Sequence, residues 1–152
     1  MQGHPFLRFL SRYAPLILWL SFISFASSNS FSASNTSRYI GPLVFWLFPD
    51  TSQETLNTIH FVVRKLAHFS EYALLGLLAA RAFRTSPNPS IRRYWFWISA
   101  ALIVIYALLD EYHQSFVPTR TASFVDSLID ISGGLTVLII LSRRRPSNIS
   151  AN

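Results

Sequence analysis

The apolar segment Ser99–Leu109 (SAALIVIYALL) is followed without a break by Asp110–Arg120 (DEYHQSFVPTR). The first segment suits the interior of a lipid bilayer, whereas the second holds two adjacent acids, a histidine and an arginine. Ionisable side chains are costly at membrane depth unless they face a bundle interior or a wet cavity and pair with one another. The junction therefore predicts a membrane helix that ends at a polar site.

The composition agrees with a membrane protein of one domain, residues 1–152. The chain is 51% hydrophobic, and its mean hydropathy of +0.33 is too high for a soluble domain that must cover itself with polar groups. Its formal net charge of +6 does not indicate nucleic-acid binding, because the basic residues lie between apolar runs instead of along one polar face. The absence of cysteine excludes disulfides and thiolate metal sites.

Four apolar runs predict an all-α membrane protein, a four-transmembrane-helix bundle. These runs are Leu10–Ser28, Phe61–Phe83, Trp95–Tyr112 and Phe124–Ser142. The second run is the membrane part of a longer helix that starts near Ser52 and continues through Ala80. Thr51 and Glu54 have the spacing of a capping box, which marks that start.

The region between the first two spans is less regular. The Ser/Asn-rich stretch Ser27–Ser37 reads as a loop. Ile40–Pro49 (IGPLVFWLFP) is apolar but too short to cross a core of ~30 Å as a helix, which indicates a short interfacial or re-entrant segment. The first span also fits a cleavable signal peptide, although Trp19 and its neighbouring phenylalanines favour a retained span.

Charge is distributed unevenly between the two ends of the spans. Nine basic residues and no acid flank one end: Arg8, Arg12, Arg81, Arg84, Arg92, Arg93, Arg143, Arg144 and Arg145. The other end holds four cations and all seven acids of the chain: Arg38, Arg64, Lys65, Arg120, Asp50, Glu54, Glu71, Asp110, Glu111, Asp126 and Asp130. Because basic connections stay in the cytoplasm, this asymmetry predicts a multi-pass protein of the cytoplasmic (inner) membrane with both termini in the cytoplasm.

Three of the predicted spans place ionisable residues at the same depth, near the outer end. Helical spacing puts those of the second span on two overlapping stripes, and those of the fourth span four residues apart on one face. We therefore predict one shared polar pocket, open to the outside. Its candidate ligand-binding residues are Arg64, Lys65, His68, Glu71, Tyr72, Asp110, Glu111, His113, Gln114, Arg120, Asp126 and Asp130.

Several of these residues also have a purely structural interpretation. Asp126 could close a capping box with Ser123 at the start of the fourth helix, Lys65 could extend to the lipid headgroups, and His68 could bond to Glu71 within its helix. The small residues of the second and fourth spans are expected at helix contacts; they are Ala73, Gly76, Ala80, Gly133 and Gly134.

Asp110 and Glu111 resist a structural interpretation best. They lie at the carboxyl end of the third helix, where the helix dipole disfavours acids. Two adjacent carboxylates repel each other unless a cation stands nearby. We therefore expect them to hold Lys65 and Arg120 around a ligand, with Lys65 paired to Glu111.

Three blocks, in this order, resemble the VanZ-like family of small integral membrane proteins. They are Arg64–Gly76 (RKLAHFSEYALLG), the pattern D-E-x-H-Q-x-F-V-P-x-R over Asp110–Arg120, and Asp126 followed by Gly133. The resemblance covers about residues 61–141. Two positions depart from the family pattern: Thr119 replaces a frequent glycine, and Asp130 replaces a usual asparagine.

The resemblance implies a membrane protein of the cell envelope, and antibiotic resistance through reduced susceptibility to the glycopeptide teicoplanin. It names no reaction. We favour binding of an envelope lipid, a lipid-linked precursor or a glycopeptide-type molecule, with the basic residues contacting phosphate or carboxylate. The alternative is an intramembrane enzyme with acid–base catalysis or a divalent metal held by His68, His113, Glu111 and Asp126. No cofactor is predicted, and the oligomeric state stays open.

Overall fold

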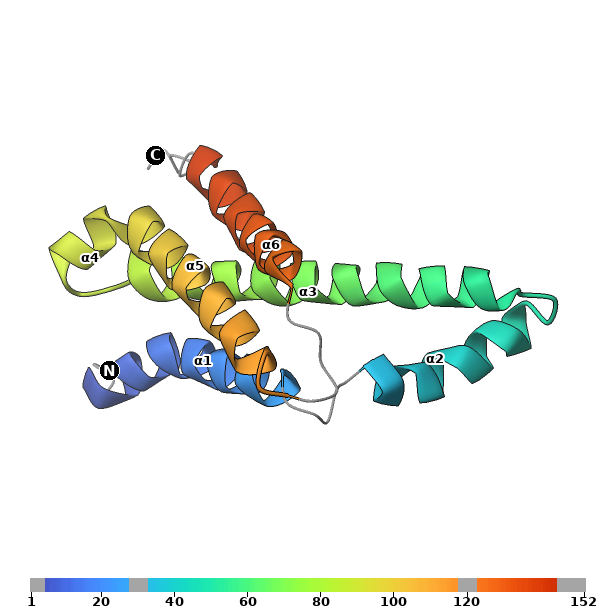
Figure 1. Cartoon of the computed structure of the whole chain (residues 1–152). Helices are drawn as coiled ribbons and strands as arrows, with labels where there is room; N and C mark the ends of the chain where they lie inside the picture. Colours follow the sequence, from blue (N-terminus) through green and yellow to red (C-terminus); the bar gives the residue numbers. More distant parts are fainter. Residues whose placement is uncertain (1–4, 28–32, 118–122, 145–152) are drawn as a thin grey trace, which may run out of the picture.

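The computed structural model describes residues 5–27, 33–117 and 123–144. Within these ranges the regular secondary structure is entirely helical (Figure 1). The helices are α1 (Pro5–Ala26), α2 (Ala33–Leu47), α3 (Gln53–Arg84), α4 (Pro89–Arg93), α5 (Trp95–Gln114) and α6 (Phe124–Arg143). The predicted all-α class is confirmed for the described part of the chain.

Three of these helices, α1, α5 and α6, are long and apolar enough to cross a membrane. They overlap the first, third and fourth predicted runs. α3 contains the second run and has 32 residues, but it carries Arg64, Lys65 and Glu71 in its central turns. That α3 is a fourth transmembrane helix therefore stays a prediction.

The start of α3 agrees with the predicted position, although a different residue caps it. The Ser52 hydroxyl accepts a hydrogen bond of 3.2 Å from the Thr55 backbone N–H, so that Ser52 is the N-cap. Thr51 instead donates its hydroxyl to the Phe48 carbonyl at 2.7 Å. The helix continues four residues beyond Ala80 and ends at Arg84.

The predicted loop over Ser27–Ser37 is wrong in its second half, because α2 begins at Ala33. Ser, Asn and Thr are weak formers of helix interiors but suit the first turn, where backbone N–H groups lack helical partners. The helix of the apolar segment therefore extends upstream into the polar stretch. With 15 residues, α2 is roughly 22 Å long, still too short to span the bilayer core.

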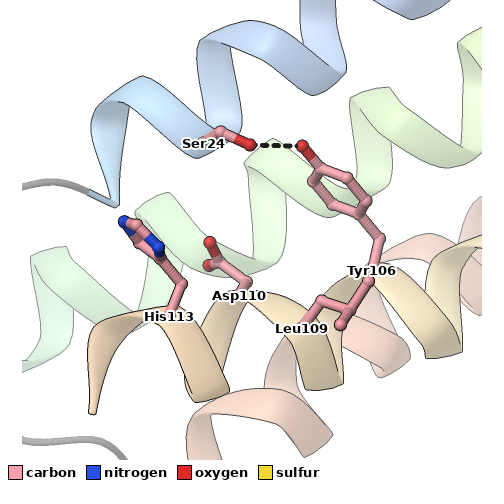
Figure 2. A pocket seen from close by; sticks show the side chains of 5 residues that line it. All are labelled: Ser24, Tyr106, Leu109, Asp110 and His113. Atoms are coloured by element: carbon pink, nitrogen blue, oxygen red, sulfur yellow. Dashed lines mark hydrogen bonds between the residues drawn. The ribbon is translucent and has the colours of Figure 1, made fainter. Parts of the chain in front are cut away.

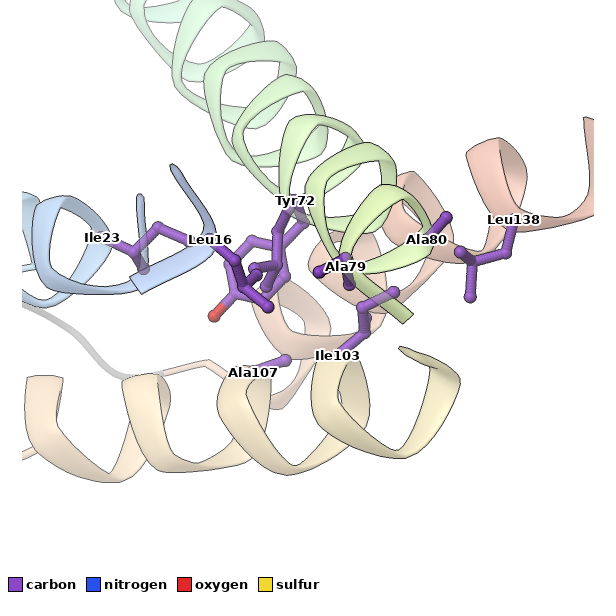
Figure 3. Packing of buried hydrophobic residues seen from close by; sticks show 10 residues of the cluster. Leu16, Ile23, Tyr72, Ala79, Ala80, Ile103, Ala107 and Leu138 are labelled. Atoms are coloured by element: carbon purple, nitrogen blue, oxygen red, sulfur yellow. The ribbon is translucent and has the colours of Figure 1, made fainter. Parts of the chain in front are cut away.

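α3 is the central helix of the molecule (Figure 1). The ends of α1 and α5 and the start of α6 come together beside its middle, whereas α2 lies along its first turns (Figure 1). The hydrophobic core follows the second half of α3, where Tyr72, Leu75 and Ala79 are fully buried against Ile103 of α5 and Leu138 of α6 (Figure 3).

Glycines bring the backbones of α3 and α6 into direct contact. A Cβ atom at Gly133 would stand 2.2 Å from the Phe69 carbonyl oxygen, and one at Gly76 would stand 2.7 Å from the Gly134 carbonyl oxygen. The predicted contact role is confirmed for Gly76, Gly133 and Gly134. This close approach of the two backbones also sets the distance between the polar side chains of α3 and α6 that lie about one helical turn from the glycines.

Candidate functional site

The contact between α3 and α6 holds a cluster of ion pairs. Lys65 Nζ pairs with Asp126 Oδ1, and Arg64 Nη2 lies 3.6 Å from Asp126 Oδ2. One turn deeper, His68 Nδ1 lies 3.1 Å from Asp130 Oδ1. Asp126 is 2% exposed and Asp130 is fully buried. These five residues form the α3–α6 ion-pair cluster.

The expected pairing of Lys65 with Glu111 is wrong, because Lys65 binds Asp126 instead. Glu111 Oε2 accepts a hydrogen bond of 2.7 Å from the Ser123 backbone N–H. Ser123 is the N-cap of α6, so α5 supplies a carboxylate to one of the free N–H groups at the start of α6. This contact explains the acid at the unfavourable end of α5, since the positive pole of α6 lies opposite it.

The capping box between Ser123 and Asp126 does not form. The Ser123 side chain makes no capping hydrogen bond, and its backbone N–H is taken by Glu111. Asp126 is therefore free of a capping role and directs its two oxygens at the cations of α3. His68 bonds through Nδ1 to Asp130 on the neighbouring helix.

The other candidate residues of α5 and α3 make contacts of their own. Gln114 Nε2 donates to Asp110 Oδ2 at 3.0 Å, one turn along α5. The fully buried Tyr72 interacts electrostatically with Asp110 and Asp130. The backbone carbonyl of Glu71 accepts a hydrogen bond of 3.0 Å from Trp19 Nε1 of α1.

Several buried polar atoms in this region have no hydrogen-bond partner, Arg64 Nε and Ser127 Oγ among them, and four more are oxygens of candidate residues. These four belong to three helices of the described chain, and they are Tyr72 Oη, Glu111 Oε1, Gln114 Oε1 and Asp130 Oδ2. Most buried polar atoms in proteins are hydrogen-bonded to protein or water. The four atoms therefore mark a place where water or the polar group of a ligand completes the bonding.

A cavity of about 190 Å³ lies between α1 and α5 at the same end of the helices (Figure 2). Two candidate residues, Asp110 and His113, line it together with Ser24, Tyr106 and Leu109. The single shared pocket stays a prediction, because Asp110 and His113 line this cavity whereas the cations of α3 and the acids of α6 form the α3–α6 ion-pair cluster. Arg120 lies outside the described residues.

Sequence reasoning did not identify Ser24 and Tyr106 as site residues. Neither side chain is ionised at neutral pH, and each looks like one polar interruption in an apolar run. One feature of the sequence could have pointed to them: a hydroxyl group in the membrane part of a helix needs a hydrogen-bond partner, either on another helix or on the backbone of its own helix. Serines that bond to their own backbone, such as Ser21, give the same signal.

A metal centre of the kind considered above is not present among the described side chains. No group of three or more His, Asp or Glu residues in the described ranges is arranged to hold a metal ion. His68, His113, Glu111 and Asp126 all belong to those ranges. The geometry therefore does not favour the metal-dependent enzyme.

The fold and the buried ionisable residues are those of an all-α membrane protein with a polar region at one end of its helices. The VanZ/LLP1 family matches residues 13–145, and the chain belongs to this family. Neither a curated protein nor a solved structure matches the chain.

Proposed function

We propose that this protein binds the polar part of an envelope lipid, a lipid-linked precursor or a glycopeptide-type molecule at the extracytoplasmic side of the cytoplasmic membrane. The four buried polar atoms without a protein partner support this function best. Two of them, on Glu111 and Gln114, belong to α5, the helix that also supplies Asp110 and His113 to the cavity. Buried acceptors of this kind are expensive unless a bound group or water satisfies them.

The proposal includes α3 as a fourth transmembrane helix. Its central cations, Arg64 and Lys65, face Asp126, so that the α3–α6 contact compensates much of the cost of their charge. At 32 residues, α3 is about 48 Å long and exceeds a bilayer core of ~30 Å. Its first turns then extend past the core, where α2 packs against them.

In this arrangement α2 lies at the outer membrane interface. Its apolar end is largely uncovered, with Trp46 78% exposed and Phe48 65% exposed. Trp and Phe at such a position can anchor a short helix at the level of the lipid headgroups.

The roles of the site residues follow from their surroundings. Lys65 and Arg64 retain side-chain exposures of 19% and 30%, which suits contact with phosphate or carboxylate at the rim. Asp110 accepts hydrogen bonds from amines or hydroxyls in the cavity. Binding would change how far the envelope molecule is exposed outside the membrane. A change of this kind would connect the function to the reduced teicoplanin susceptibility that the family resemblance implies.

Cysteine labelling tests the sidedness and the crossing of α3 together. The chain contains no cysteine; Gln53 is an exposed residue at the start of α3, and Ser90 is an exposed residue of α4, beyond the other end of α3. We expect an impermeant thiol reagent on intact cells to label Gln53→Cys and to label Ser90→Cys only after lysis. Equal labelling of both in intact cells would contradict the fourth span.

Lipid analysis of the purified protein tests the binding function. We expect mass spectrometry to find an envelope amphiphile that co-purifies with the full chain and is lost in Asp126→Asn when equal amounts of folded protein are compared. Glu54→Gln is the matched control, because Glu54 is an exposed acid in the first turn of α3, away from the cluster. Equal retention in Asp126→Asn and Glu54→Gln, or no bound amphiphile in the unaltered chain, would refute the function.

A further inference from the structure

We infer that the cavity between α1 and α5 selects a hydrogen-bond donor, the hydroxyl- or ammonium-bearing head group of an amphiphile, over a bare phosphate. This inference rests on the proposed function and names its ligand class. It adds Ser24 and Tyr106 to the site.

The hydroxyl groups in the cavity wall have used their hydrogens. Tyr106 Oη donates to the Leu20 carbonyl of α1 at 2.6 Å, and a phenol has a single hydrogen. Ser24 Oγ lies 2.5 Å from Tyr106 Oη, so Ser24 must be the donor of that hydrogen bond (Figure 2). Both oxygens therefore offer only lone pairs to a molecule in the cavity.

Asp110 adds a stronger acceptor to the same wall. Its side chain extends from α5 into the space below α1 (Figure 2), and the residue is 7% exposed. An ionised carboxylate accepts hydrogen bonds and donates none, and one oxygen can accept several. Asp110 already accepts from Gln114, and together with Ser24 and Tyr106 it presents acceptor oxygens to a ligand in the cavity.

The size and edge of the cavity fit the head of an amphiphile. About 190 Å³ is more than ten times the ~10–15 Å³ of accessible volume that one water molecule requires, so that a polar group of several atoms can enter. Leu109 lines the cavity and is 55% exposed. An apolar tail can therefore leave the cavity along α5 into the surrounding lipid.

A phosphate group matches this wall poorly, because among the described residues that line it His113 alone can offer a ring N–H. Its oxygens are acceptors and would face the lone pairs of Ser24 and Tyr106 and the carboxylate of Asp110. The cations Lys65 and Arg64 bind Asp126 in the α3–α6 ion-pair cluster, and neither is among the described residues that line the cavity. The anionic part of a lipid thus belongs at the cluster and the donor part in the cavity.

Three lipids with identical acyl chains test the selection on the full chain in nanodiscs, with retention measured by native mass spectrometry. Phosphatidylethanolamine offers an ammonium group, a monoglucosyl diacylglycerol offers hydroxyls, and phosphatidic acid has neither head group. We expect about tenfold or greater preference for at least one of the first two over phosphatidic acid, as hydrogen bonds to charged or buried acceptors provide. The lipid that is retained shows whether an ammonium group or a hydroxyl group supplies the hydrogen-bond donor.

Two variants connect the selection to the cavity. Ser24→Ala should reduce the retention of the preferred lipid severalfold, whereas Ser21→Ala should leave it unchanged, because Ser21 bonds only to the Ile17 carbonyl of its own helix. Asp110→Asn should reduce the retention of the ammonium lipid more than that of the glucosyl lipid, since it removes the charge but keeps an acceptor.

The outcomes separate this inference from the proposed function. Retention of phosphatidic acid equal to that of both donor lipids, or identical behaviour of Ser24→Ala and Ser21→Ala, would overturn the donor selection. If an envelope amphiphile still co-purifies and is lost in Asp126→Asn, the proposed function stands without it. Absence of any bound amphiphile would refute both.

Discussion

The contact between α3 and α6 and the contact between α1 and α5 solve the same problem in different ways. Both bury polar side chains at one end of the bundle. In the first, glycines let the backbones touch, and each acid of α6 faces a basic residue of α3. In the second, the helices meet through Tyr106, which contacts Leu20 and Ser24, and they enclose a cavity beside Asp110.

Asp126 and Asp110 illustrate the difference. Both are buried acids near helix ends. Asp126 is surrounded by Lys65 and Arg64 and holds two helices together, whereas Asp110 accepts from Gln114 and lines a space large enough for a polar group. A closed polar contact serves stability, and an open one leaves room for a ligand. Four predictions test this division, from the largest expected effect to the smallest.

Gly133→Ala should have the largest effect, because the new Cβ would meet the Phe69 carbonyl oxygen at 2.2 Å and a backbone atom cannot move aside. Overpacking usually costs ~1–3 kcal/mol, and here we expect more, with loss of folded protein on extraction. Size-exclusion chromatography and thermal unfolding in detergent measure it. Gly41→Ala is the matched control, since no atom stands within 4 Å of its added Cβ. A well-folded Gly133→Ala would show that α3 and α6 do not touch here.

Loss of one ion-pair partner should be next. Lys65→Met or Asp126→Asn leaves a buried charge uncompensated, which costs up to ~3–5 kcal/mol. The partial exposure of Lys65 and the presence of Arg64 place the effect near the lower end. The double variant should be more stable than the sum of the two losses predicts, because the orphan charges disappear together. Thermal unfolding of all four proteins gives this coupling, and simple additivity would mean that the pair contributes nothing.

Substitution of Glu111 should lower the stability less, and the loss should depend on whether a hydrogen-bond acceptor remains more than on the charge. Glu111→Ala removes the acceptor of the Ser123 N–H and should lower the free energy of unfolding by ~0.5–2 kcal/mol, as for other helix caps. Glu111→Gln keeps an acceptor and should retain most of the stability. Chemical unfolding of the two variants compares them. If Glu111→Gln were as unstable as Glu111→Ala, the negative charge of Glu111 and not its acceptor oxygen would be what stabilises the protein.

Tyr106→Phe should have the smallest effect on stability. It removes the hydroxyl that bonds to the Leu20 carbonyl and accepts from Ser24, each worth ~0.5–1.5 kcal/mol. Because the α1–α5 contact is open, water can replace part of this loss, so we expect at most about 1 kcal/mol in thermal unfolding. A loss of stability as large as that of Asp126→Asn would show that the α1–α5 contact is closed and structural, as the α3–α6 contact is.

The sequence alone determined the helical class, the positions of three apolar helices, the start of α3 and the small-residue contact between α3 and α6. These features depend on local composition and spacing, which a single chain segment displays. The family resemblance through Arg64–Gly76 and Asp110–Arg120 also needs no structure, because it is carried by residue order.

Only the tertiary structure decided which partner each ionisable residue takes. Lys65 could reach Glu111 or Asp126 by any argument from helical spacing, and the glycine-mediated approach of α6 to α3 selects Asp126. Glu111 then bonds to the free N–H of Ser123, a group that no pattern within α5 reveals. The cavity depends on where Ser24 of α1 falls opposite Tyr106 of α5. Periodicity fixes the face of one helix, but the offset between two helices is set by packing across their whole contact, which no single segment encodes.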